Sequence, residues 1–328
     1  MKNILPTLLA AAAMAAGLTA PAAAEQAPAD WRPSRPVRII VPIVGSTNDV
    51  LARLVAPKLQ EVFGQPFVVE NKGGAGGNIG AAEVVRAAPD GHTLLVGYNG
   101  PLAINVTLFD KMPYDPRKDL APITLAVKSP QYLVVNPSTG IASVQDFIAK
   151  AKANPAKYSY GSVSVGSASH LTMEMMKSAA GFRMTHIPYR GAGPAVADLL
   201  AGNVQAGFFV PGNVQGFVKE GKLKLLATTG ARRFPSTPDV PTLAESGLKD
   251  FEATSWIGFL APAGTPANIV KRYNEAFVRI LNSPEIKARL EEMEFEVVAS
   301  SPQEFSRWID TEIVRWGAVI KETGAKAD

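Results

Sequence analysis

Two loops rich in small polar residues hold the groups of this chain that are best suited to chemistry. The first, 42–49, stands between an apolar segment and a segment with helical periodicity. Backbone N–H groups at a helix start, together with the helix dipole, bind carboxylates. The loop therefore predicts an anion site, although its polar residues would also serve as a plain helix cap. The predicted ligand contacts are Ile43, Val44, Gly45, Ser46, Thr47 and Asn48.

A second loop, 160–170, has the same character. It contains four serines and two glycines, and a helix is expected to begin near its end. Two such helix starts facing each other across a cleft would hold the two ends of a dicarboxylate. The alternative is an ordinary polar loop. The predicted contacts here are Ser162, Ser164, Ser167, Ser169 and His170.

Two shorter segments are weaker candidates of the same type. Tyr98 and Asn99 follow an apolar run, and Arg190 precedes a glycine-containing helix start. A guanidinium pairs well with a carboxylate, so Arg190 is a possible ligand contact, and a solvated surface arginine is the equal alternative.

The groups that an enzyme or a metal site would need are missing from the sequence. The chain has no cysteine, and its three histidines, His92, His170 and His186, lack metal-ligand spacing. The glycine-rich segment 73–80 has Ile79 where a dinucleotide fingerprint needs its third glycine. No phosphate-binding loop and no nucleophile elbow occur. We predict binding without a cofactor, and a secreted α/β enzyme is the competing class.

Alternating strands and helices must position these loops. The first part of the chain reads as strands at 37–41, 67–70 and 93–97 with helices at 49–63 and 79–87. This order predicts a mainly parallel sheet with helices on both faces. A second unit has strands at 132–135, 158–161, 186–189, 206–210 and 223–229 and helices at 144–153, 169–180, 192–201 and 214–220. Helices at 267–281, 284–291 and 302–323 and a strand at 295–298 close the chain.

The number of strands is too large for one open sheet, which predicts an α/β fold of two lobes. The closing helices have no sheet of their own, so the chain must cross between the lobes twice, near 127–130 and near 253–256. The first lobe would comprise 25–127 and 253–328, and the second 128–252. A ligand would bind between the lobes, at loops that follow the carboxyl ends of strands.

The N-terminus has the pattern of an export signal. Met1 and Lys2 form a basic start, 4–16 is apolar, and 21–25 provides a small-x-small cleavage site after Ala24. The apolar stretch is too short to span a membrane, and a retained N-terminal helix is the alternative. We expect export to the periplasm, with no cysteine at the cleavage point to carry a lipid anchor.

Composition limits the partners. The 33 basic and 29 acidic residues give a formal net charge of +4, spread along the chain. This balance argues against nucleic acid and suits a small anionic ligand.

The chain resembles the solute receptors of tripartite tricarboxylate transporters, the Bug-type or TctC-like periplasmic binding proteins. The segments that carry the resemblance are 35–42, 68–80, 89–94, 112–116, 160–162, 187–191, 239–242 and 261–266. They occur in the family's order over essentially the whole mature chain. The first loop is one residue shorter than the usual family pattern and lacks its second proline and one glycine.

The resemblance implies a type II-like periplasmic binding protein that bends at a hinge. Its partners would be a small organic anion, such as a di- or tricarboxylate, and the large and small permease subunits of the TctA/TctB kind. We expect a monomer. A receptor that feeds a periplasmic sensor kinase is the alternative.

Family comparison also gives Phe209 a role. Several relatives that bind amino-bearing ligands have an acidic residue in the segment that corresponds to 208–210. Phenylalanine does not pair with ammonium, so we expect an anion without an amine, with an apolar or aromatic body resting on Phe209 and Tyr98. The alternative is that Phe209 points into the core of the second lobe, because strand residues alternate faces.

Overall fold

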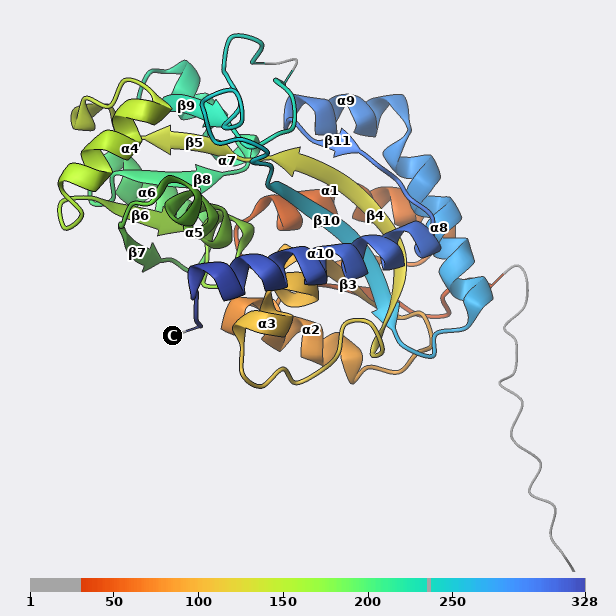
Figure 1. Cartoon of the computed structure of the whole chain (residues 1–328). Helices are drawn as coiled ribbons and strands as arrows, with labels where there is room; N and C mark the ends of the chain where they lie inside the picture. The colour runs from red at the N-terminus through yellow and green to blue at the C-terminus, as the bar shows by residue number, and fades with distance from the viewer. Residues whose placement is uncertain (1–30, 235–236, 328) are drawn as a thin grey trace, which may run out of the picture.

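Two β-sheets flanked by helices form the framework of the protein (Figure 1). The computed structural model describes residues 31–234 and 237–327, so the predicted export signal at 1–24 lies outside the described residues. The six-stranded sheet has the order β11-β4-β10-β3-β1-β2 and the five-stranded sheet the order β7-β6-β8-β5-β9. The first sheet consists of β1 (Val37–Val41), β2 (Phe67–Asn71), β3 (Thr93–Tyr98), β4 (Leu120–Pro130), β10 (Thr254–Pro262) and β11 (Glu296–Val297); the second of β5 (Tyr132–Val135), β6 (Ser159–Ser162), β7 (Thr185–Pro188), β8 (Ala206–Phe209) and β9 (Lys224–Thr228).

Both sheets are mixed. In the first, β1 runs parallel to β2 and β3, whereas β10 runs antiparallel to β3 and β4, and β11 antiparallel to β4. In the second, β6 runs parallel to β7 and β8, and β5 runs antiparallel to β8 and β9. Most strands of each sheet therefore point one way, and the prediction of a two-lobe α/β fold is confirmed.

Helices cover both faces of the first sheet. The alternation of side chains along β1 divides the core: Val37 and Ile39 pack into one apolar cluster and Ile40 into the other. The first cluster includes α1 (Thr47–Phe63), α8 (Ala267–Leu281) and α9 (Pro284–Glu292). The second includes α2 (Asn78–Val85), α3 (Asn105–Leu108) and α10 (Pro302–Thr323), and a short π-helical turn, η2 (Gly100–Ile104), follows β3.

The second sheet is covered in the same way. Phe208 and Phe209 are neighbours in β8 and bury their rings in different clusters. The Phe208 side has α4 (Val144–Ala153) and α5 (Ala168–Ala180), and the Phe209 side has α6 (Ala192–Ala201) and α7 (Pro211–Lys219).

The last helix, α10, extends from the first lobe to the second. It begins with a capping box formed by Ser301 and Glu304. Along the first sheet it buries one apolar face, made by Phe305, Ile309, Ile313, Trp316 and Ile320, with Trp316 fully buried. Trp308 is instead half-buried, and the Lys128 ammonium lies 3.3 Å from its ring centroid. At its far end α10 contacts α5, where the Ser178 hydroxyl donates to the Glu322 carboxylate over 2.9 Å (Figure 1).

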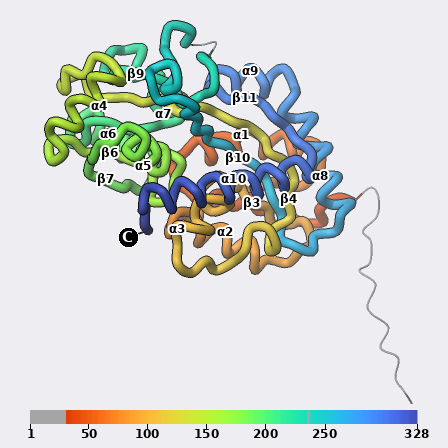
Figure 2. Tube along the Cα trace, viewed as in Figure 1, coloured from red at the N-terminus to blue at the C-terminus, as the bar shows by residue number. Residues whose placement is uncertain are grey.

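The chain crosses between the sheets on two strands that lie side by side. Pro130 of β4 pairs with Thr254 of β10. Just beyond them, Thr229 exchanges hydrogen bonds with Gln131 and accepts one from the Ala253 N–H. In Figure 2 the early and late parts of the chain share one body, and the middle part forms the other. The lobe boundaries at 127/128 and 252/253 stay a prediction.

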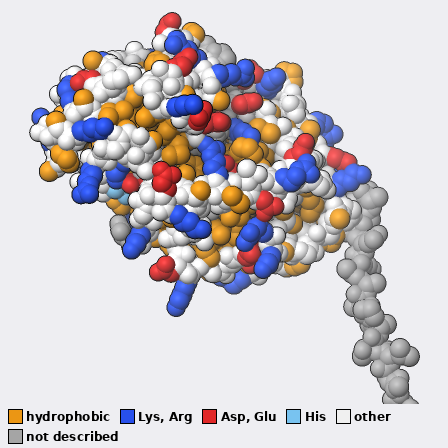
Figure 3. All heavy atoms as spheres, viewed as in Figure 1, with side chains coloured by type: hydrophobic (Ala, Val, Ile, Leu, Met, Phe, Trp, Pro, Cys, Tyr) orange, Lys and Arg blue, Asp and Glu red, His pale blue; other side chains and the backbone are white. Residues whose placement is uncertain are grey.

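The surface agrees with the scattered charge of the sequence. Basic and acidic side chains are interspersed over the visible face, without a patch of one sign (Figure 3). Within the described residues, no helix has both the length and the apolar character that a membrane span requires.

Candidate functional site

A small cavity of about 60 Å³ lies where the two lobes meet. Its walls come from the loops that follow β1, β3, β6 and β8, and from the start of β10. The structure brings nine of the predicted site residues together around this cavity. They are Ile43, Ser46, Thr47, Asn48, Tyr98, Asn99, Ser167, Ser169 and Phe209.

Four helices direct their N-termini at this cavity. The lining includes the first residues of α1 and α5, Ala192 at the start of α6, and Val210 and Asn213 at the start of α7. Among the described residues that line it, none is charged. Each helix N-terminus carries unpaired N–H groups and a partial positive charge. Four such N-termini at a described lining without charge favour a small anion.

The start of α1 is left open. Ser46 is the N-cap residue, yet its side chain makes no capping hydrogen bond. The Ser46 hydroxyl and the Asn48 amide nitrogen are buried and have no hydrogen-bond partner among the described residues. A buried donor without a partner costs about 1–3 kcal/mol. Both groups can therefore donate a hydrogen bond to a ligand oxygen. The plain helix cap, which the sequence left open as an alternative, is not formed, because the Ser46 side chain makes no capping hydrogen bond.

The serines of the second loop support one another and still face the cavity. The Ser167 hydroxyl donates to the Ser164 carbonyl over 2.7 Å and accepts from the His170 N–H over 3.3 Å, capping α5. The Ser169 hydroxyl lies 2.9 Å from that of Ser167 and accepts from the Val163 N–H. This network holds the loop in one shape against the cavity.

Tyr98 and Asn99 differ in what they can offer a ligand. The Tyr98 hydroxyl donates to the Gly76 carbonyl over 3.1 Å. Burial raises the pKa of the Tyr98 phenol, and the nearby Ser164 hydroxyl opposes this only in part, so the phenol stays neutral. The Asn99 amide nitrogen already donates to the Thr254 carbonyl and to Glu312, and its oxygen accepts from the Trp256 N–H. Asn99 therefore shapes the cavity wall through bonds within the protein.

The sequence left open whether Phe209 faces the ligand site or the core of the second lobe, and in the structure it borders both. It lines the cavity and belongs to the apolar cluster beneath α6 and α7, with 1% of its surface exposed. Gly207 makes room for its ring, because a Cβ there would lie 2.4 Å from a ring carbon. A contact between Phe209 and the ligand stays a prediction.

Six predicted residues do not line the cavity: Val44, Gly45, Ser162, Ser164, His170 and Arg190. Val44, Gly45 and Arg190 are exposed. Ser162 is buried behind the loop, where its hydroxyl donates to the Ser164 carbonyl and lies 2.6 Å from His186 Nε2.

The lobes touch at the mouth of the cavity. A Cβ added to Gly191 of the second lobe would lie 2.6 Å from the Val44 carbonyl oxygen of the first. A Cβ on Gly76 would lie 3.1 Å from the Val165 carbonyl oxygen across the same seam. Glycine at these positions lets the two backbones approach each other closely.

His170 lies beneath the second loop in a stack of rings. Its ring lies 4.0 Å from that of His186, at an interplanar angle of 6°, and Tyr160 stacks on the other face of His186 at 4.8 Å. His170 Nδ1 accepts from the Gly166 N–H over 3.3 Å. Burial, with the Lys177 ammonium as a second cause, lowers the pKa of His170 to about 4. At neutral pH His170 is therefore uncharged, and its Nδ1 can accept the hydrogen bond from Gly166 that helps to fix the second loop.

Several lining residues were missed by the sequence reasoning. Asn213 had a usable signal, because Pro211 at the first helical position marks the start of α7 and hence another N-terminus. Val163, Ala168, Ala192, Phe208 and Val210 also line the cavity, and they lie within or directly beside segments that the sequence had singled out. Gln131, Ser255, Trp256 and Ile257 come from the crossings between the lobes, and Phe295 lies just ahead of β11; these five carry no local signal.

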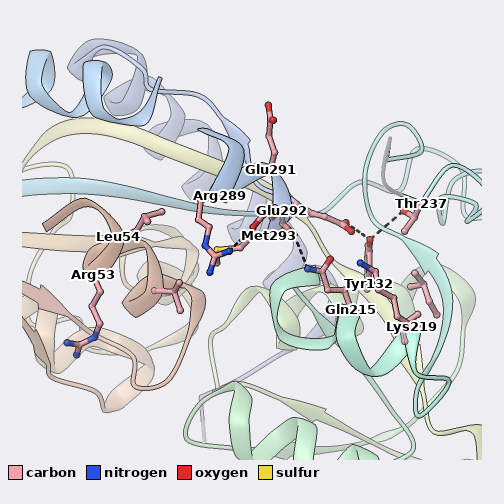
Figure 4. Close-up of a pocket in the computed structure, with 14 residues that line it drawn as sticks. Arg53, Leu54, Tyr132, Gln215, Lys219, Thr237, Arg289, Glu291, Glu292 and Met293 are labelled. Carbon is pink, nitrogen blue, oxygen red and sulfur yellow. Dashed lines mark hydrogen bonds and ion pairs between the residues drawn. The ribbon is translucent and has the colours of Figure 1, made fainter. Parts of the chain in front are cut away.

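A larger hollow of about 800 Å³ lies between α1, α7 and α9 (Figure 4). Gln215 donates to the Glu292 carbonyl over 2.9 Å, and the Tyr132 hydroxyl donates to the Glu294 carboxylate. Its walls carry acidic and basic side chains in similar number, and no helix N-terminus is aimed into it. Mixed charge gives no preference for an anion, so we assign the candidate site to the smaller cavity.

Among the described residues, no group of three His, Asp or Glu side chains is placed to hold a metal ion.

The chain matches a described protein family and several known proteins. Residues 51–325 match the family described as "Tripartite tricarboxylate transporter family receptor". The chain is 37% identical to "Protein BugT" of Bordetella pertussis over 313 residues, which cover 95% of this chain and 94% of that protein.

Solved structures are similar over nearly their whole length. The structure "R. palustris Rpa4515 with adipate" has a TM-score of 0.86 and 36% identity, covering 90% of this chain and 99% of that one. "MatC (Rpa3494) from Rhodopseudomonas palustris with bound malate" has a TM-score of 0.83 and 32% identity, with coverages of 88% and 99%. The "periplasmic binding protein BugD" has a TM-score of 0.85 and 32% identity, with coverages of 90% and 100%.

The buried His170 predicts a loss of stability on acidification. In the unfolded chain an imidazole takes up its proton near pH 6.5, and in the folded protein His170 does so only near pH 4. Between these values the unfolded state binds more protons, so the free energy of unfolding falls as the pH falls, by up to about 1.4 kcal/mol per pH unit. Urea unfolding between about pH 7 and about pH 4.5 measures the slope, and His170→Gln should flatten it. An equal slope in both proteins would contradict this assignment.

Proposed function

The chain belongs to the tripartite tricarboxylate transporter family of receptors, and on this premise we propose that it captures a small organic carboxylate between its lobes and delivers it to a permease of that transporter type. One observation carries the proposal: four helix N-termini converge on a cavity whose described lining is uncharged, and there the Ser46 hydroxyl and the Asn48 amide nitrogen have no hydrogen-bond partner among the described residues. These groups can donate hydrogen bonds to the oxygens of a dehydrated carboxylate.

The ligand class follows from the same lining. Adipate and malate, the molecules bound in two similar structures, are both dicarboxylates. No acidic side chain of the described residues lines the cavity of this chain to pair with an ammonium group. We therefore propose a di- or tricarboxylate, or an aromatic carboxylate, without an amino group, resting on Phe209.

The mechanism that corresponds to this proposal is ligand binding without a chemical reaction. The ligand would contact both lobes and favour the closed arrangement, whose surface the large and small permease subunits would recognise. Among the described residues that line the cavity there is no histidine and no ionisable acid or base apart from the neutral Tyr98, which supports a receptor over an enzyme. We further propose that the protein is a monomer exported to the periplasm with its signal removed after Ala24.

A thermal-shift screen tests the function directly. The panel is adipate, malate, citrate and benzoate, set against putrescine and glucose. A ligand present at about a hundred times its dissociation constant stabilises the folded protein by about 2.7 kcal/mol. We expect a clear rise in melting temperature with one or more carboxylates. A rise with putrescine or glucose alone would refute the anion proposal.

Removing the free hydroxyl should weaken binding without weakening the fold. Ser46→Ala deletes a donor that has no partner in the described part of the chain, so the melting temperature should stay unchanged. Affinity for the bound carboxylate should fall about tenfold, the equivalent of about 1.4 kcal/mol. Isothermal titration calorimetry measures the affinity.

Ser143→Ala is the matched control. Ser143 caps α4, accepting from the Asp146 N–H over 3.1 Å, and does not line the cavity. Its loss should cost about 1 kcal/mol of stability and leave affinity unchanged. If the two variants have the same affinity, Ser46 is not a ligand contact.

The seam between the lobes gives a second test. Gly191→Ala places a methyl group 2.6 Å from the Val44 carbonyl oxygen at a φ of +123°, so closure should be blocked and carboxylate affinity should fall at least about tenfold. Gly193→Ala, two residues along in α6, meets no atom within 4 Å and should bind normally. Equal affinities, measured by calorimetry, would mean that closure does not need this contact.

A further inference from the structure

A buried carboxylate lies in the core beneath α10, at a distance in sequence from every loop of the site. Glu312 is 1% exposed. Its Oε2 accepts from the Trp256 Nε1–H over 2.8 Å, from the Trp316 Nε1–H over 2.9 Å and from the Asn99 amide over 3.3 Å. Its Oε1 lies 3.4 Å from an Arg315 nitrogen. Burying a carboxylate is costly unless donors of this kind surround it.

The donors to Glu312 belong to segments that meet at the second crossing between the lobes. Asn99 follows β3, and Trp256 stands near the start of β10, where the chain returns to the first sheet. Arg315 extends the connection, because its guanidinium also donates to the Glu252 carbonyl just ahead of β10. One oxygen of Glu312 therefore joins the last helix to both segments.

Asn99 connects Glu312 to the backbone at the second crossing. Its amide nitrogen donates to the Thr254 carbonyl over 3.1 Å, and its amide oxygen accepts from the Trp256 N–H over 3.1 Å. Asn99, Ser255 and Trp256 all line the ligand cavity. The orientation of the Asn99 amide, which Glu312 helps to fix, thus sets the position of the strand that forms this wall.

We propose that Glu312 is a positioning residue for ligand capture: it holds Asn99 and Trp256 so that the cavity wall at the second crossing keeps its binding geometry. The inference rests on the proposed carboxylate function. A residue that only packs α10 onto the sheet would affect stability alone. Glu312 should affect affinity beyond its effect on stability, and it should do so through Asn99.

Trp316 provides the matched control. It lies four residues from Glu312 on the same helix and donates to the same oxygen, yet it does not line the cavity and has no bond to the crossing. Trp316→Phe and Glu312→Gln each weaken the buried cluster. Both should lower the melting temperature, and only Glu312→Gln should raise the dissociation constant, by about tenfold against less than about twofold for Trp316→Phe.

A double-mutant cycle tests the route through Asn99. Calorimetry is carried out with whichever of adipate, malate, citrate or benzoate shifts the wild-type protein most. We expect Glu312→Gln to change the dissociation constant much less in an Asn99→Ala background than in the wild type, because the group it acts through is then absent. If Glu312→Gln fails to fold, Glu312→Asp, which keeps the charge and withdraws it by one methylene, takes its place in the cycle.

The outcomes separate the two proposals. A wild-type protein that binds none of the four carboxylates defeats the proposed function. Wild-type binding with an unchanged dissociation constant in the Glu312 variant, with equal losses in the Glu312 and Trp316 variants, or with fully additive effects in the cycle overturns the positioning role and leaves the receptor function intact.

Discussion

The convergence of four helix N-termini on one cavity is the constraint from which the rest of the architecture follows. A helix that follows a strand starts near the strand's carboxyl end, so the sheets of both lobes must turn those ends toward each other. The positive ends of α1, α5, α6 and α7 then gather at a single point. Neither sheet has this site alone, because α1 belongs to the first lobe and the other three helices to the second.

Two facing lobes require a hinge that keeps their alignment, and the crossing strands supply it. β4 and β10 pair along nearly their whole length, and the pairing shifts register twice. Thr229, Gln131 and Ala253 continue the hydrogen bonding into the second lobe, while the network around Glu312 fixes the return of the chain. Glycines at the opposite seam allow the backbones to meet. Any bending between the lobes would therefore act at these few crossing residues.

The sequence predicted the parts of this structure that depend on local periodicity. The strands around the first two loops and the helix at 302–323 were recovered because their apolar residues repeat at strand or helix spacing. The long strands β4 and β10 were missed. Pro122 and Pro130 interrupt the strand pattern of β4, and Pro122 lies where the pairing with β10 shifts register. His170 and Ser162 face away from the cavity, a matter of helix and strand orientation that spacing does not fix. The buried network around Glu312 could not be predicted from the sequence, because its partners are brought together only by the tertiary fold.

The absence of charge from the described lining suits the proposed receptor, which would both bind and release its ligand. A buried arginine would bind a carboxylate strongly, and after release it would leave an unpaired charge in a closed or half-closed cleft at a cost of several kcal/mol. Helix ends and hydroxyls accept water at little cost, so the emptied site is not penalised in the same way. Glu312 fits this scheme because its charge is satisfied by three donors of the protein itself, behind the wall it supports. The fixed charge of Glu312 then maintains the geometry of the cavity wall. The helix dipoles supply the reversible attraction for the ligand.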